Sequence, residues 1–178
     1  MKDKKIKVYK GCHYSNEWPL SFICHSKDKT RKESGIYLFT KSCRYMIGAD
    51  QTDKNKLFGW SYGIHHKNSV RCGWYYDIEN DSIKLCLYVY DDGKVVKKEI
   101  AKGFNIGTYV EIRLEAKSDD NGVLEYCLTA ATVGNYQRHQ ATYVVENKEG
   151  LPKWGYKLKV YFGGNRTAPH TIEIDKVP

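Results

Sequence analysis

The hydrophobic residues of this chain recur mainly with a period of two. Between residues 110 and 116 every second residue is apolar and those between are charged, and Leu124, Tyr126 and Leu128 repeat the spacing. Successive side chains of a β-strand point to opposite faces of a sheet, so this alternation is typical of strands with one buried face. No segment shows the 3.6-residue apolar stripe of an amphipathic helix. The pattern therefore predicts an all-β protein.

Turn signals divide these strand patterns. The runs Asp91-Asp-Gly93 and Asp119-Asp-Asn-Gly122 predict hairpins. The segment 129–153 is long, polar and irregular, with an edge strand expected near 142–145. The predicted strands cover residues 21–25, 35–47, 57–64, 69–76, 83–90, 94–100, 110–116, 124–128, 157–162 and 172–174.

Length and composition fit a single β-sandwich. The chain has 178 residues, of which 41% are hydrophobic, and it contains 15 Tyr. A chain of this size can bury a core, and tyrosine suits half-exposed sheet faces. We therefore expect a jelly-roll sandwich of two antiparallel sheets at 21–178, preceded by a basic arm or first strand at 1–20.

The segment 161–174 has unusual loop chemistry between two strand patterns. Gly163 and Gly164 allow backbone angles that a side chain would forbid, and Asn165 tolerates left-handed geometry. Pro169 fixes its own φ, and His170 is expected to hold the loop by a hydrogen bond. We interpret the segment as a structural loop, the closing corner of the sandwich.

This segment carries a family resemblance. Its Tyr161-Phe-Gly-Gly-Asn165 and Ala168-Pro-His170 sequences resemble the closing strands of concanavalin-like jelly rolls, which include alginate-lyase-like enzymes and glycan-binding proteins. Two further blocks, 66–74 and 83–93, resemble proteins of Bacteroidetes and of their crAss-like phages. The resemblance covers about residues 37–177 and implies the fold more strongly than the function.

Two catalytic hypotheses find little support in the residues. The resemblance to alginate-lyase-like enzymes implies a Gln-x-His strand and an Arg-x-Glu-x-Arg strand. The second sequence does not occur here, and the tripeptide Gln137-Arg-His139 lies in the polar segment 129–153, outside the predicted strands. A glycoside hydrolase needs two carboxylates on one strand face. Asp77, Glu79 and Asp81 have the spacing, but their sequence is typical of a hairpin turn. These observations predict a protein without catalytic activity.

An aromatic hairpin provides a candidate glycan site. Its rings could stack on sugars, and nearby polar side chains could bond hydroxyls or carboxylates, although core packing explains at least half of the aromatics. The candidate residues are Trp60, Tyr62, Asn68, Arg71, Trp74, Tyr76 and Arg44.

Charge and candidate ligands change this picture little. The net charge is +8, but the lysines are scattered apart from the run at 1–7, so a nucleic-acid partner is not expected.

His65 and His66 are adjacent and poor joint metal ligands. Asp50, Asp53 and Asn55 could contribute to a structural calcium site; no other cofactor is expected. The wide cysteine spacings favour reduced thiols.

The sequence-based hypothesis is a virion protein. Neither a membrane-spanning stretch nor a secretory signal is seen. With the phage resemblance, this predicts an auxiliary capsid protein that docks on a protein lattice through its basic N-terminus and the 129–153 loop. Two alternatives stay open, a free lectin-like module that binds glycans and an alginate-lyase-like polysaccharide lyase.

Overall fold

The computed structural model describes residues 3–17, 19–121, 123–146 and 148–177. Two short 3₁₀ turns, η1 (Lys41–Cys43) and η2 (Gly48–Asp50), accompany the strands. The strands are β1 (Lys4–Val8), β2 (Ser21–Cys24), β3 (Arg31–Phe39), β4 (Asn55–Ser61), β5 (Ser69–Asp77), β6 (Ser82–Asp91), β7 (Lys94–Asn105), β8 (Tyr109–Ser118), β9 (Leu124–Thr132), β10 (His139–Val144), β11 (Trp154–Leu158) and β12 (Ile172–Val177).

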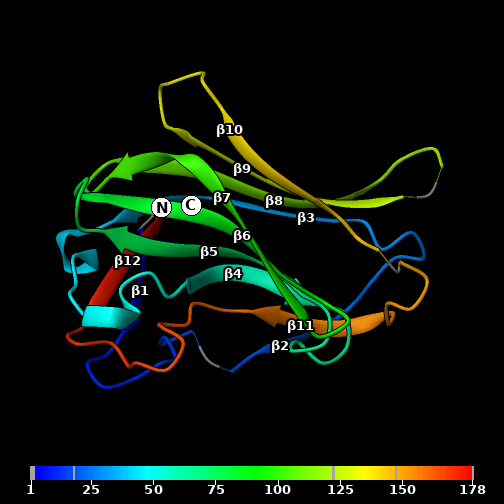
Figure 1. Cartoon of the computed structure of the whole chain (residues 1–178), viewed down its shortest axis with the longest axis horizontal. Coiled ribbons are helices and arrows are strands. Elements are labelled where there is room, and N and C mark those ends of the chain that lie inside the picture. Colours follow the sequence, from blue (N-terminus) through cyan, green and yellow to red (C-terminus); the bar gives the residue numbers. More distant parts are fainter. Residues whose placement is uncertain (1–2, 18, 122, 147, 178) are drawn as a thin grey trace.

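The strands form two antiparallel sheets that pack face to face (Figure 1). Within the described residues, sheet A has the order β1-β12-β3-β8-β9-β10 and sheet B the order β2-β11-β4-β5-β6-β7. This arrangement confirms the predicted all-β jelly-roll sandwich. At one edge, Tyr143 Oη of β10 donates a hydrogen bond to Asp91 Oδ2 of β6 at 2.9 Å and so ties sheet A to sheet B.

The core lies between the two sheets and is formed by every second residue of the strands, as the alternation of apolar and polar residues predicts. Val110, Ile112 and Leu114 of β8 are fully buried, as are the alternating β6 residues Leu85 and Leu87. The opposite face of β6 carries polar and aromatic side chains. One face of sheet B is therefore core and the other is available for function.

Most predicted hairpins are present, but the segment 129–153 is more ordered than expected. Strand β9 continues to Thr132, and β10 returns along it as the edge strand of sheet A, which confirms the edge strand expected there. The loop between them extends beyond the sheet at the top of Figure 1. The polar sequence concealed these strands because both have an exposed face.

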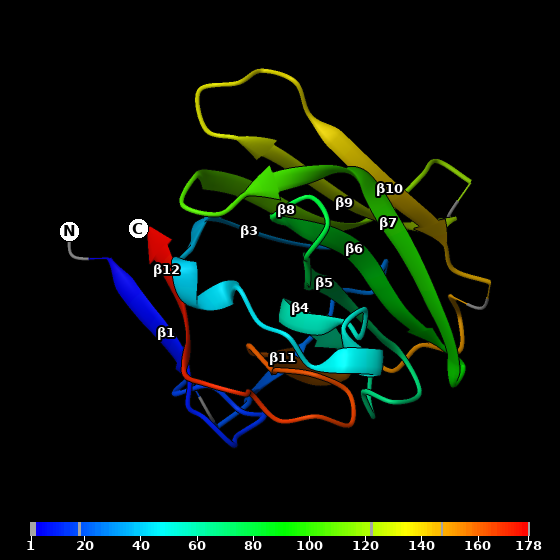
Figure 2. The same cartoon turned by 60° about the vertical axis from the view of Figure 1, so that its left-hand side comes forward.

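The two ends of the chain lie in the same sheet. Strand β1 lies beside β12 (Figure 2) and pairs with it along its full length. Ile6 and Val8 of β1 are buried in the core. The described N-terminal residues therefore include a sandwich strand. In the described ranges, no helix has the length and apolarity needed to cross a membrane.

The segment after β11, where the sequence predicts a corner, connects sheet B to sheet A. Gly163 has φ +76°, a value that favours glycine. His170 Nε2 donates a hydrogen bond to the carbonyl oxygen of Ser42 at 2.7 Å.

Candidate functional site

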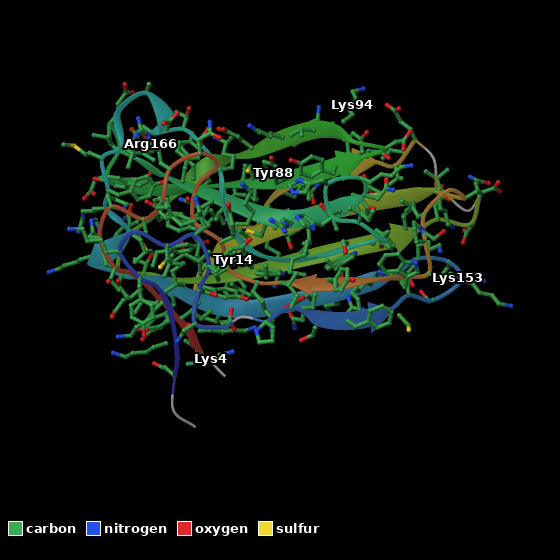
Figure 3. The ribbon with its side chains drawn as sticks, turned by 90° about the horizontal axis from the view of Figure 1, so that it is seen from below. Lys4, Tyr14, Tyr88, Lys94, Lys153 and Arg166 are labelled. Atoms are coloured by element: carbon green, nitrogen blue, oxygen red, sulfur yellow. The ribbon has the colours of Figure 1, made fainter. Side chains whose placement is uncertain are left out.

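A cavity of about 380 Å³ opens on the outer face of sheet B. Strands β4, β5 and β6 form its floor, the N-terminal segment and the corner after β11 form one wall, and the β4–β5 loop lies at the other end. Figure 3 labels Tyr88 on the sheet and Tyr14 on the N-terminal segment. The lining residues are Tyr14, Ser15, Leu20, Lys56, His65, His66, Arg71, Tyr88, Tyr90, Lys159, Val160, Tyr161, Gly163, Gly164 and Asn165.

The floor depends on the strand register. Arg71 of β5 pairs with Tyr88 of β6 on one side and with Gly59 of β4 on the other. A Cβ at Gly59 would lie 2.7 Å from Arg71 Cα and 3.0 Å from Arg71 Cγ, so glycine leaves the space that the arginine occupies. Because a β-bulge falls between Lys56 and Phe58, Lys56 also points to the outer face, opposite Gly73.

The wall is built from both ends of the chain. Tyr14 and Lys56 each form an isolated bridge with Tyr161. The His13 ring stacks on Tyr161 with 5.1 Å between centroids, and its Nδ1 lies 2.8 Å from the carbonyl oxygen of Phe162. Asn55 Oδ1 accepts a hydrogen bond from the amide of Gly163 at 2.5 Å. The corner therefore lines the cavity, a role that the sequence interpretation did not assign to it.

The cavity is strongly cationic. Among the described residues that line it, none is Asp or Glu, whereas Lys56, Arg71 and Lys159 are basic. Burial, reinforced by repulsion from Arg71, lowers the pKa of Lys56 to about 8. Burial likewise lowers the pKa of Arg71 to about 10. Its Nε is buried and has no hydrogen-bond partner among the described residues. Such a site favours an anion.

Tyrosines and histidines surround these cations. Burial raises the pKa of Tyr88, so its phenol stays protonated at neutral pH. His65 and His66 lie in the β4–β5 loop, as predicted, with 4.1 Å between ring centroids. Burial and the charge of Arg71 lower the pKa of His65 to about 4, which keeps its imidazole neutral at physiological pH. The cavity therefore holds a neutral base and a protonated acid beside two cations.

The structure separates most of the predicted glycan-site residues from this cavity. Trp60, Tyr62 and Trp74 lie in the core, where at most 1% of each is exposed, so their rings cannot stack on a ligand. The error arose because alternation does not show which face of the hairpin is buried. Of the seven predicted residues, only Arg71 lines the cavity.

The remaining three predicted residues have structural partners. Arg44 makes a two-pronged ion pair with Asp81, whose Oδ1 also accepts a hydrogen bond from Tyr76 Oη at 2.9 Å. Asp81 lies in the predicted hairpin turn. Asn68 Oδ1 accepts a hydrogen bond from the amide of Asp92 at 3.0 Å and so connects two loops.

Two of the three proposed calcium ligands, Asp50 and Asn55, have protein partners. Asp50 forms an ion pair with Arg166 at 2.9 Å, and the Asn55 side-chain nitrogen donates a hydrogen bond to Tyr45 Oη at 2.8 Å. The described residues contain no group of three or more His, Cys, Asp or Glu side chains arranged to hold a metal.

Sequence reasoning missed most of the cavity. Lys56, Tyr88 and Tyr90 lie on strands, and the sequence offered one signal for two of them: Tyr88 and Tyr90 alternate with the apolar Leu87 and Val89. That spacing places both tyrosines on the outer face. Tyr14 had no comparable signal, because its position depends on a bridge to a residue near the other end of the chain.

Comparisons with known proteins support the fold. No known family matches the sequence, and no curated protein matches it. Among solved structures, a double mutant of alginate lyase Aly36B in complex with alginate tetrasaccharide has a TM-score of 0.65 at 13% identity, over 98% of this chain and 78% of that one. The PL-14 alginate lyase from Aplysia kurodai has a TM-score of 0.61 at 13% identity, over 98% and 80%.

A lectin shares the same architecture. The winged bean acidic lectin complexed with methyl-α-D-galactose has a TM-score of 0.52 at 8% identity, over 98% of this chain and 96% of the lectin.

These findings correct the sequence-based hypothesis. They contradict the hypothesis of a non-catalytic capsid protein, because the similar structures are lyases and a lectin. Nothing in these comparisons supports a place in a virion. The resemblance to Bacteroidetes and phage proteins finds no support either. The chain has the concanavalin-like jelly-roll fold that alginate lyases and legume lectins share.

Proposed function

We propose that this protein binds an acidic polysaccharide in the cavity of sheet B and cleaves it by β-elimination, as a polysaccharide lyase. One observation carries the proposal. The buried Lys56 and the partly buried Arg71 face a cavity whose described lining contains no carboxylate. A uronate residue, which is a sugar with a carboxylate at C5, would supply the missing charge.

Binding would make use of the planar guanidinium of Arg71. Its fork of N–H donors matches a carboxylate, and the buried Nε is available to donate. The Lys56 ammonium adds a second positive charge. Both pKa values are lowered by burial, so an anion that enters the cavity stabilises both charged forms.

The same cations would assist the chemistry. Removal of the C5 proton places negative charge on C5, and the adjacent carboxylate shares that charge. Fixed positive groups that face this carboxylate stabilise the transition state more than the ground state. The electron pair of the former C5–H bond then forms the C4–C5 double bond as the C4–O4 bond breaks.

Proton transfer needs one acceptor and one donor. His65 lines the cavity as a neutral imidazole and is the candidate acceptor of the C5 proton. Its pKa of about 4 makes it a weak base, and the carboxylate of a bound uronate would raise that pKa. The Tyr88 phenol is protonated and is the candidate donor of a proton to the departing O4 oxygen. Burial raises its pKa, so the transfer depends on the negative charge that develops on O4. Both side chains line the cavity with Arg71. The products are a new reducing end and an unsaturated sugar.

A second candidate is a lectin-like module that binds the polysaccharide without cleaving it. The sequence favours this alternative in one respect, because the chain lacks an Arg-x-Glu-x-Arg sequence. The cationic cavity would then serve binding alone, and the phenols and imidazoles would provide hydrogen bonds to sugar hydroxyls.

A panel of polyuronates separates these functions. Calorimetry measures binding, and the ultraviolet absorbance of the unsaturated product measures cleavage. We expect Arg71→Met to weaken binding about 10- to 100-fold, the loss of a charged hydrogen bond. We expect Tyr88→Phe to retain binding and lose cleavage. Arg44→Met, outside the cavity, is the matched control.

Each outcome selects one function. Binding with product formation supports the lyase. Binding without product from any polyuronate supports the lectin-like module. A wild-type protein that binds none of the panel, or an Arg71→Met variant that binds as tightly as the wild type, contradicts the proposed site.

A further inference from the structure

Three aromatic side chains form an exposed cluster at the edge of sheet B, which we call the aromatic platform: Phe22 of β2, and Trp154 and Tyr156 of β11. Phe22 is 62% exposed and Trp154 is 41% exposed. The Phe22 and Trp154 rings are nearly parallel, with 10° between planes and 6.3 Å between centroids. Tyr156 meets both rings edge-on. The three rings thus hold one another in place while two of them remain open to solvent.

The platform lies on the same face of sheet B as the cavity. Leu158 of β11 pairs with Gly59 of β4, which pairs with Arg71 of β5, so these residues share the outer face. Tyr156 and Trp154 follow Leu158 with the strand period of two and therefore share this face. Phe22 pairs with Tyr156 across the strands. Strand spacing and rise place Tyr156 about 12 Å from Arg71.

The segment before β2 connects the cavity to the platform. Leu20, which lines the cavity, lies two residues before Phe22. The amide of Tyr156 donates a hydrogen bond to Ser61 Oγ, which fixes β11 beside β4. In Figure 3, Lys153, the residue before β11, lies toward the end of the molecule away from Tyr14. A chain leaving the cavity toward β2 therefore crosses β4 and reaches the platform.

The exposed rings favour a sugar chain as the occupant. The platform serves the core little, because Phe22 and Trp154 pack chiefly on each other and on Tyr156. Flat aromatic rings with one open face suit the C–H faces of pyranose rings. A ligand anchored at Arg71 would also hold its next sugars close to the platform, so little extra entropy would be lost on contact.

We propose that the aromatic platform is a distant subsite, which binds sugar rings of the same polysaccharide chain whose uronate occupies the cavity. This inference rests on the proposed function. The distance between the platform and the Arg71 guanidinium exceeds the length of one sugar ring. Binding at the platform therefore makes the protein selective for long chains and directs it to interior bonds of the polymer.

Chain length provides the test. The double variant Phe22→Ala/Trp154→Ala is compared with the wild type on a polyuronate and on the disaccharide of the same sugar, which is too short to reach both sites. We expect the affinity for the polymer, or 1/KM if cleavage occurs, to fall about tenfold, while disaccharide binding and kcat are unchanged. Tyr136→Ala, a fully exposed aromatic in the β9–β10 loop, is the control and should match the wild type.

The outcomes distinguish this inference from the proposed function. If the wild type binds no polyuronate, both are overturned. If the wild type binds the polymer and the double variant binds it equally well, or loses the disaccharide to the same extent, the platform alone is overturned. If the double variant has a lower melting temperature than the wild type, Trp154→Leu replaces it, because leucine keeps apolar volume on β11 and removes the flat ring. Its binding to the polymer and to the disaccharide is then compared in the same way.

Discussion

At the scale of single residues, Lys56 is the most unusual side chain of the site. Only 8% of it is exposed, yet no carboxylate pairs with it among the described residues. Its ammonium donates a hydrogen bond to the carbonyl oxygen of Gly163 at 3.2 Å and lies 4.9 Å from the centroid of the Tyr88 ring. A carbonyl and an aromatic face compensate only in part for lost hydration. An anion bound beside the Lys56 ammonium would therefore stabilise its charged form.

This environment predicts a pH dependence of binding. Since the pKa of Lys56 is lowered to about 8, its charge is present below that pH and lost above it, whereas a uronate stays ionised throughout. We expect the affinity for polyuronate to fall as pH rises from about 7 to about 9.5. Anion binding itself raises the pKa of Lys56, so the fall begins at higher pH in the complex. Calorimetry across this range measures it.

Lys56→Arg provides the control, because arginine keeps its charge to higher pH than lysine in the same environment. Its affinity should change much less with pH than that of the wild type. A wild-type affinity that stays flat across the same range would show that the Lys56 charge takes no part in binding.

At the scale of elements, β4 illustrates how far the sequence predicts the site. The hairpin of β4 and β5 and its connecting loop were predicted from apolar runs and the intervening polar residues, and the structure confirms them. The bulge after Lys56 was not predictable, because it depends on the pairing partner. That bulge sets which face Lys56 occupies, so the alternation pattern placed the strand correctly and could not identify its functional side chain.

Gly59 of β4 provides a test of this geometry. A Cβ at this position would clash with the backbone of Val70 and Arg71, so Gly59→Ala must displace β5. We expect a loss of about 2–3 kcal/mol in the free energy of unfolding, together with weaker polyuronate binding. Chemical denaturation and calorimetry measure the two effects.

Gly107→Ala is the matched control for Gly59→Ala. Gly107 has φ +84° but nothing within 4 Å of a Cβ, so its substitution adds backbone strain without a clash. It should cost about 1 kcal/mol and leave binding unchanged. Equal losses at the two positions would contradict the packing role given to Gly59.

At the scale of the whole molecule, the distribution of charge and the shape of the cavity favour the same class of ligand, an acidic polysaccharide. The net charge of +8 is scattered in the sequence, and for that reason it did not predict a site. Folding concentrates part of it: Lys56, Arg71 and Lys159 come from three different strands or loops and line one cavity. Lys97 of β7 lies beside it, with Nζ 5.7 Å from the centroid of the Tyr88 ring. Such convergence depends on topology and not on local sequence.

The salt dependence of binding follows from this convergence. Added salt screens the attraction between the protein and an acidic polymer, since the Debye length falls from about 10 Å at 0.1 M to about 3 Å at 1 M. We expect the polyuronate affinity to fall by about tenfold or more over that range. A neutral polysaccharide tested in parallel should show little change. A polyuronate affinity that is independent of salt would contradict an electrostatic site.

The wall of the cavity has a consequence for how the protein is made. His13 and the carbonyl oxygen of Phe162 that it contacts are 149 residues apart in the chain, and the Tyr14–Tyr161 bridge spans nearly the same separation. A ribosome must therefore release almost the entire chain before this wall can close. Contacts so distant in sequence form slowly, because the intervening loop must first be ordered. The nascent protein thus acquires its ability to bind a ligand as one of the last events of folding.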